Sequence, residues 1–170
     1  MPTGPRFCCV DVDYRAGCVV AACVGFGEWT AEKSSLELVV PSRAEPAPYE
    51  RGRFSRRELP YLLELFSRLP VLPRVILVDG FVWLGPGLPG LGARLHEALN
   101  GQVAVVGVAK RPYRGQAEGV PVYRGKSRRP LIVTAVGMAL AEAARGVAAM
   151  HGQSRIPTFI RCADRLSRES

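Results

Sequence analysis

Residues 7–27 read FCCVDVDYRAGCVVAACVGFG, and this stretch decides the fold. Two apolar runs rich in β-forming residues, 7–13 and 17–27, are separated only by Tyr14-Arg15-Ala16-Gly17. This spacing, with a glycine in the short connection, is typical of a β-hairpin. The second run is too short to cross a bilayer as a helix. The sequence therefore predicts a pair of antiparallel strands at the start of the domain.

Downstream of this hairpin the pattern switches between strands and helices. The apolar run RVILV at 74–78 ends at Asp79-Gly80, as a buried strand would. A helix and a further strand follow it, so we expect a parallel pair joined by a right-handed crossover. The predicted strands cover 35–40, 74–78, 103–108 and 131–134, the helices run from Ser55 or Glu58 to about Leu69, from about Leu91 to Asn100 and over 137–150, and the chain after 151 is expected to be irregular.

These elements add up to an α/β fold, in which an antiparallel N-terminal meander grows into a mixed sheet with flanking helices. The 170 residues are 48% apolar and 22% charged, which is ordinary for one globular domain over residues 1–170. The five cysteines form an odd set without a C-x-x-C pair. We read them as buried free thiols of a cytoplasmic protein, and expect no leader, no membrane anchor and a monomer.

Three acidic residues stand at positions where a charge needs an explanation. Asp11 lies between apolar neighbours inside the first strand, where a carboxylate is costly unless a cation compensates it. Asp79 ends the central strand, although Asp79-Gly80 could also be a plain turn. Glu58 has capping-box spacing from Ser55, which alone would explain it. If the strands of Asp11 and Asp79 pair, their side chains can hold Mg²⁺ with carboxylate and water ligands.

The basic residues gather in two places. The chain carries 23 Lys and Arg against 15 Asp and Glu, a net charge of +8 that favours a polyanionic partner. One cluster, at 51–57, abuts Glu58. The other is interleaved with Tyr113 and Tyr123 and suits a phosphate backbone, although such a run is usually a solvated face. Its members are Lys110, Arg111, Arg114, Arg124, Lys126, Arg128 and Arg129.

The string GPGLPG at 85–90 satisfies G-x-G-x-x-G after a strand, but we do not read it as a dinucleotide site. Its prolines remove amide donors that a pyrophosphate would need, and two antiparallel strands precede it, unlike the start of a dinucleotide-binding fold.

Several strings in series resemble the endonuclease V family. They are PYERGRFSRRE at 48–58, VDG at 78–80, GVAK at 107–110, RGKSR at 124–128, PL at 130–131 and RIPTFIRCAD at 155–164. The resemblance runs from about residue 8 to residue 164. It implies a ribonuclease H-like fold that, with Mg²⁺ or with Mn²⁺ in its place, nicks DNA one nucleotide 3′ of deoxyinosine in DNA repair. Some relatives act on inosine in RNA.

The resemblance also assigns residues. Asp11, Glu58 and Asp79 match the family's metal-site acids and would be catalytic, and Lys110 matches a lysine near the reacting phosphate. His96 falls on a histidine of a family helix. The residues expected to bind nucleic acid are Tyr49, Arg51, Gly80, Lys110, Arg124, Lys126 and Arg128.

The chain departs from the family pattern at Met138, in the lesion wedge, and after Asp79-Gly80, where Phe81 and Val82 blur the family's D-G-H-G string. Gly137-Met138 stands where the family has Gly-His, whose histidine belongs to the active site. Met138 therefore lies either in the active site or in the core, where methionine commonly fills space. The family's lesion wedge, P-Y-I-P, is Pro48-Tyr49-Glu50-Arg51 here. A metal-dependent endonuclease is the leading hypothesis. The alternatives are a nucleic-acid-binding protein with weak or lost cleavage and a nuclease acting on inosine-containing RNA.

Overall fold

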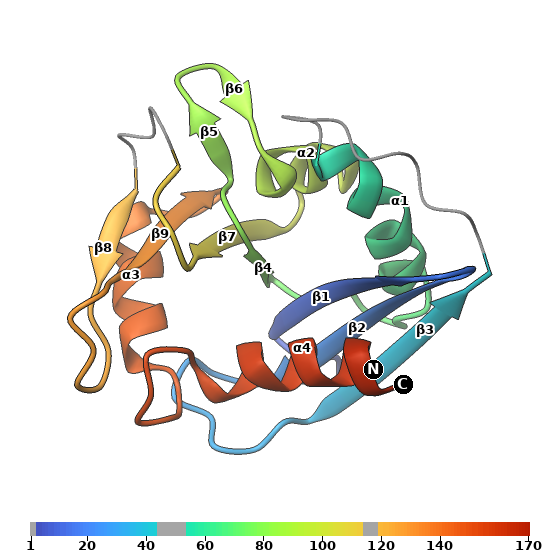
Figure 1. The fold of residues 1–170 in the computed structure, drawn as a ribbon, viewed down its shortest axis with the longest axis horizontal. Helices are drawn as coiled ribbons and strands as arrows, with labels where there is room; N and C mark the ends of the chain where they lie inside the picture. Colours follow the sequence, from blue (N-terminus) through green and yellow to red (C-terminus); the bar gives the residue numbers. More distant parts are fainter. Residues whose placement is uncertain (1–2, 44–53, 114–118) are drawn as a thin grey trace.

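The structure is a computed structural model that describes residues 3–43, 54–113 and 119–170 (Figure 1). Its centre is a seven-stranded mixed sheet in the order β3-β2-β1-β4-β7-β9-β8. The strands are β1 (Phe7–Arg15), β2 (Cys18–Phe26), β3 (Leu36–Ser42), β4 (Val75–Asp79), β7 (Ala104–Ala109), β8 (Val120–Val122) and β9 (Leu131–Val136). The predicted α/β class and mixed sheet are confirmed.

The hairpin that opens the chain forms as predicted. β1 and β2 pair antiparallel from Phe7 opposite Phe26 to Arg15 opposite Cys18. Gly17 has a φ of +72°, a left-handed conformation that glycine adopts without steric cost. β3 adds to the free side of β2 in antiparallel register. The meander thus places the predicted acidic strand, β1, next to the parallel part of the sheet.

The parallel part is built by the expected strand–helix–strand unit. β1 pairs with β4, and β4 pairs with β7, both in parallel, with α2 (Leu91–Ala98) between β4 and β7 in the chain. β9 then pairs antiparallel with β7, and β8 with β9. The carboxyl ends of β4 and β7 consequently lie at one edge, the edge at which α/β sheets usually bind ligands.

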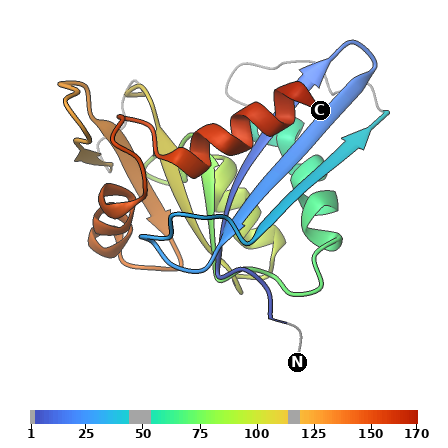
Figure 2. The same cartoon turned by 90° about the horizontal axis from the view of Figure 1, so that it is seen from below.

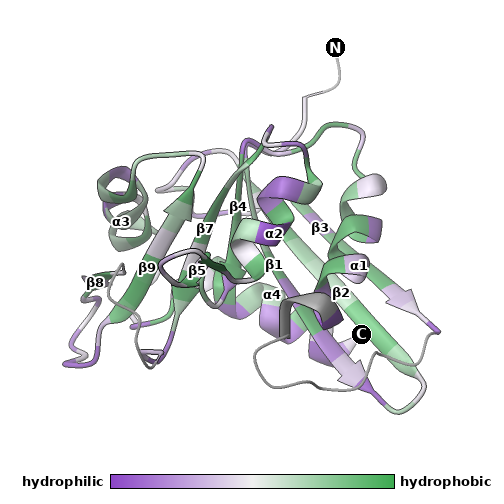
Figure 3. Ribbon diagram, turned by 90° about the horizontal axis from the view of Figure 1, so that it is seen from above, coloured by the Kyte–Doolittle hydropathy of each residue, from purple (hydrophilic) through white to green (hydrophobic). Residues whose placement is uncertain are grey.

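Helices cover both faces of this sheet (Figure 2). On one face α1 (Phe54–Ser67) and α2 pack on the side chains of Cys8, Val10 and Val12 of β1. On the other face α3 (Leu140–Ala149) and α4 (Thr158–Glu169) pack on Phe7 and Cys9. The strands between the two layers are mainly hydrophobic (green in Figure 3). In the described ranges, no helix is long and apolar enough to span a bilayer.

Two expectations about the C-terminal half were wrong. The chain after 151 is not irregular throughout, because α4 forms there and lies across β1 and β2 (Figures 1 and 2). It buries Phe159, Ala163 and Ser167, spaced four residues apart on one helical face. The predicted helix over 137–150 starts only at Leu140, since Gly137 has a φ of +81° that ends the extended chain of β9.

The glycine- and proline-rich string at 85–90 belongs to a small separate hairpin. β5 (Trp83–Gly85) and β6 (Leu88–Pro89) pair antiparallel around Gly87, which has a φ of +71°. The hairpin stands out from the body of the molecule (Figure 1), with Leu88 59% exposed. A short β-turn therefore accounts for these glycines.

Candidate active site

A pocket opens where β1 and β4 stop pairing. The two strands are paired only from Phe7 opposite Val75 to Cys9 opposite Leu77. Beyond that point they separate, and a pocket of about 210 Å³ lies between their ends. Five carboxylates from four elements line it: Asp11, Asp13, Glu58, Asp79 and Asp164. The structure therefore brings together the three acids predicted from the sequence.

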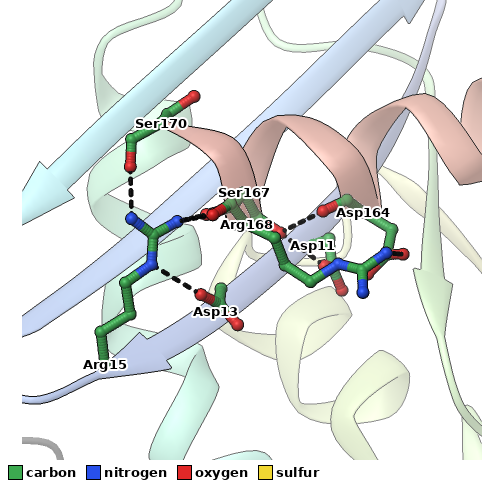
Figure 4. Close-up of polar contacts among 7 residues, drawn as sticks. All are labelled: Asp11, Asp13, Arg15, Asp164, Ser167, Arg168 and Ser170. Carbon is green, nitrogen blue, oxygen red and sulfur yellow. Dashed lines mark hydrogen bonds and ion pairs between the residues drawn. The ribbon is translucent and has the colours of Figure 1, made fainter.

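Asp11 lies deepest among the acids of the two strands. Its side chain points to the α4 face of β1, where the hydroxyl of Ser167 donates a hydrogen bond of 2.7 Å to Oδ2 (Figure 4). The pKa of Asp11 is raised from 3.8 to about 6, mainly by burial and also by the nearby carboxylates of Asp164 and Asp79, whereas the Ser167 hydrogen bond opposes the rise. The strand thus holds a carboxyl group whose charge is poorly compensated.

Glu58 reaches the pocket from the opposite layer, on α1. It is 9% exposed, and burial raises its pKa from 4.5 to about 8, with Asp11 and Asp79 adding repulsion and Arg57 opposing it. α1 begins at Phe54, so Ser55 is already inside the helix. The capping-box explanation of Glu58 requires a serine in front of the helix and does not apply here. A buried acid facing other acids is typical of a functional site.

Asp79 lies at the outer rim, at the last position of β4. Its Oδ2 is 3.4 Å from Nζ of Lys110, which follows β7. Both side chains are more than 40% exposed, so water screens this ion pair and its contribution to stability is small. Gly80 follows with a φ of +133°, a conformation that favours glycine. The predicted catalytic lysine therefore adjoins the predicted acids.

Asp164 is the acid that the sequence reasoning missed. It lies on α4, lines the same pocket, and pairs with Arg168 one turn later at 2.6 Å. This acid ends the family-like string RIPTFIRCAD, but the sequence predicts an irregular segment there. The spacing of Phe159 and Ala163 was the available signal, because it predicts an amphipathic helix that places residue 164 beside the sheet.

Arg15, at the end of β1, fastens the far end of α4 to the sheet (Figure 4). Its guanidinium donates to the carbonyl oxygens of Ser167, Arg168 and Ser170, with the bonds to Ser167 and Ser170 both 2.6 Å. Nε donates to Asp13 at 2.9 Å. The last carbonyls of a helix have no partners within it, and a cation there also complements the helix dipole. This contact holds Asp164 and Ser167 over Asp11.

The residues predicted to bind nucleic acid divide into three groups. Lys110, Lys126 and Arg128 are exposed, and Gly80 is half-buried at the rim. Arg124 is only 4% exposed, and its guanidinium donates to five carbonyls, including those of Val147 and Met150 at the end of α3. Its position therefore gives it a structural role. Tyr49, Arg51 and Arg114 lie outside the described residues.

Met138 lies at the opposite edge of the sheet from the acids. Val136, the last residue of β9, pairs with Val105, whereas Asp79 pairs with Val108 three residues further along β7. At about 3.3 Å per residue, more than about 10 Å separates Met138 from Asp79 along the strands. Met138 packs against the core cluster beneath α3. Of the two locations considered for Met138, the active site is therefore excluded, and the residue packs half-buried against the core.

The position of the half-buried His96 near that edge fits this correction. The ring of His96 is bonded through Nδ1 to the carbonyl of Val103 at 2.6 Å, and its Cε1 lies close to Gly137. His96 thus fixes the loop before β7 and not the acidic pocket.

Comparison with known proteins agrees with this arrangement. The family model described as Endonuclease V matches residues 6–145. The chain belongs to the endonuclease V family. An endonuclease V from Desulfurococcus amylolyticus is 33% identical over 111 residues, which is 65% of this chain and 49% of that protein. The chain spans about half to three fifths of the length of the curated relatives it matches.

Solved structures of the endonuclease V family confirm the predicted ribonuclease H-like fold. That of the Streptomyces avermitilis enzyme is 28% identical with a TM-score of 0.78, covering 99% of this chain and 82% of that one. The Ciona intestinalis endonuclease V, in complex with DNA containing an inosine followed by a ribo-adenosine, has a TM-score of 0.80 over 96% of this chain and 84% of its own. At 19% identity, that likeness shows the fold alone.

Proposed function

We propose that this chain is a metal-dependent endonuclease that nicks DNA near deaminated bases, with deoxyinosine as the lesion. The observation that carries the proposal is the pocket at the sheet edge, where carboxylates from β1, α1, β4 and α4 face one another beside Lys110. Membership of the endonuclease V family and the net charge of +8 support a nucleic-acid substrate. The inosine-containing DNA in the Ciona complex supports the choice of lesion.

The donor set fits a hard divalent cation such as Mg²⁺. All its members are carboxylate oxygens, which Mg²⁺ prefers, and burial and mutual repulsion raise the pKa of Asp11 and of Glu58. A cation in the pocket would relieve that repulsion. As the described side chains lie, no three Asp, Glu, His or Cys residues surround one point. Asp79 faces Lys110 and Asp164 faces Arg168, so these ion pairs must open for the acids to converge.

We assign a separate role to each residue of the pocket. Asp11, Glu58 and Asp79, with Asp164 added by the structure, would hold the ion. When bound, the metal would activate water and stabilise the leaving oxygen of the phosphodiester. Ser167 keeps Asp11 oriented through its hydrogen bond. Lys110, once released from Asp79, would contact the reacting phosphate, and Lys126 and Arg128 would neutralise neighbouring phosphates.

The alternative of a binding protein with lost cleavage rested on Met138 in place of a histidine. Since Met138 packs half-buried against the core at the other edge of the sheet, that reason no longer counts against cleavage. An RNA substrate is a second outcome of the same assay.

The test compares nicking of deoxyinosine DNA, inosine RNA and undamaged duplex, each with Mg²⁺ and with Mn²⁺. Asp79→Asn should abolish cleavage while leaving the melting temperature and most of the DNA affinity unchanged, because Asp79 is exposed and acts only through the ion. Glu97→Gln, on an exposed face of α2, is the control and should cut normally. Manganese binding, followed by electron paramagnetic resonance, should weaken in Asp79→Asn alone. Equal manganese binding by both variants would refute the metal site.

A further inference from the structure

Two aromatic side chains stand together just beyond the acidic pocket. Phe81 follows Asp79 by two residues, and Tyr113 follows Lys110 by three. Their ring centroids are 6.1 Å apart with an interplanar angle of 60°, an edge-to-face arrangement. The Asp79–Lys110 ion pair joins the two segments closer to the sheet. The rings therefore lie next to the point where a reacting phosphate would sit.

The backbone holds Phe81 in place. The N–H of Val82 donates to the hydroxyl of buried Thr134 at 2.9 Å, and the carbonyl of Val82 accepts from Gly90 at 2.8 Å. Gly107 makes the first of these bonds possible, because a Cβ at that position would lie 2.5 Å from the Thr134 hydroxyl. A ring mounted on such a fixed turn offers a preorganised surface, which reduces the entropy lost on binding.

Tyr113 is the more solvent-exposed ring of this pair. It is 44% exposed, although its ring already contacts Phe81. An aromatic ring that is both held and exposed beside a cationic residue suits a nucleobase, whose face can stack on it while its phosphate is bound nearby. Stacking on aromatic residues does not select the base, because every base has a π-face.

We propose that the Phe81–Tyr113 pair is a stacking site for one unpaired nucleobase next to the reacting phosphate. This inference deepens the proposed nuclease function and rests on it for the identity of the ligand. Tyr113 provides the stacking face, and Phe81 holds that face in position.

The test is a binding measurement without metal, so that no strand is cut. A short single strand of mixed bases is compared with an abasic strand that has the same phosphates, using fluorescence anisotropy in EDTA. Tyr113→Ala should weaken binding of the base-bearing strand about 5- to 150-fold, the range for one lost stacking contact, and leave the abasic strand unaffected. Tyr113→Phe should keep wild-type affinity for both strands, because the ring remains.

Tyr123→Ala is the matched control, since Tyr123 is 63% exposed within the basic stretch and contacts no other ring among the described residues. It should leave the ratio of the two affinities unchanged. If Tyr113→Ala weakens both strands equally, or neither, the stacking site is refuted. An RNA strand added to the comparison distinguishes the two sugars.

A cleavage assay then locates the base. A set of deoxyinosine strands is used, each with one abasic site at a different position. Tyr113→Ala should lower the cleavage rate of every strand except the one whose abasic site removes the stacked base. If the wild-type protein cuts no strand, the proposed nuclease function fails, whereas the binding comparison still decides on the stacking site.

Discussion

Replacing Glu58 by glutamine should stabilise the metal-free protein while abolishing its activity. Glu58 is 9% exposed, and burial together with Asp11 and Asp79 raises its pKa from 4.5 to about 8. Between these values the folded protein keeps a proton that the unfolded chain releases. The folded state binds more protons there, so its free energy of unfolding falls as the pH rises from 4.5 to 8. Glutamine does not titrate, so the Glu58→Gln protein does not lose this stability as the pH rises.

The size of the effect follows from the same values. At pH 7 the pH is 2.5 units above the ordinary glutamate pKa of 4.5. At ~1.36 kcal/mol for each unit, Glu58 lowers the free energy of unfolding by about 3 kcal/mol at this pH. Near pH 4.5 the difference between the variants should vanish. Urea unfolding in EDTA at pH 5, 7 and 8.5 measures the trend. The Asp11 carboxyl contributes a similar loss between pH 3.8 and about 6 in both proteins, so it does not affect the comparison at higher pH.

Glu64→Gln on the exposed side of α1 is the control, because the contacts of Glu64 with Arg68 and with the Ser42 hydroxyl are both exposed to solvent. It should change stability by less than about 0.5 kcal/mol at every pH. A Glu58→Gln protein that is no more stable than the wild type at pH 8.5, or whose gain is the same at pH 5, would refute the assignment of Glu58 as a buried, repelled acid.

Three further changes test the framework around the pocket. Arg124→Ala should lower the free energy of unfolding by about 2–4 kcal/mol, because buried carbonyls at the end of α3 lose their donor, whereas Lys126→Ala should leave urea unfolding unchanged. Arg15→Ala should speed amide hydrogen exchange in the last turn of α4 and slow single-turnover nicking, and normal exchange there would contradict its role. Met138→His should lower the melting temperature without raising the nicking rate, so a faster enzyme would return residue 138 to the active site.

The elements that the sequence predicted well are those whose pattern is local. The runs of β1, β2 and β4 are apolar, and the turns between elements contain glycine, so strand identity and pairing followed from neighbouring residues. Asp11 and Asp79 were singled out because each interrupts or ends such a run. Pairing of the two strands was the only further assumption needed to predict that these side chains lie close together.

What the sequence could not provide depends on distant packing. Arg124 and Lys126 stand two residues apart in one basic stretch, yet only the first is buried, because the end of α3 happens to cover it. Asp164 was missed because the segment of α4 is polar overall and was therefore expected to be irregular, although Phe159 and Ala163 share one face of the helix. For Met138, the sequence offered only the neighbouring Gly137 as a guide. A glycine there does not show at which edge of the sheet β9 ends.

Because the pocket needs α4, it can form only late in the synthesis of the chain. The hydrogen bond between Asp11 and Ser167 joins residues 156 positions apart in the chain. At about 5–20 residues per second, a ribosome needs roughly 8–30 s to add that length. During this interval β1 has emerged, but the helix that brings Asp164 and Ser167 has not. A nascent chain therefore carries an incomplete set of acids during this interval, and the finished pocket exists only after α4 has been synthesised and has docked on β1.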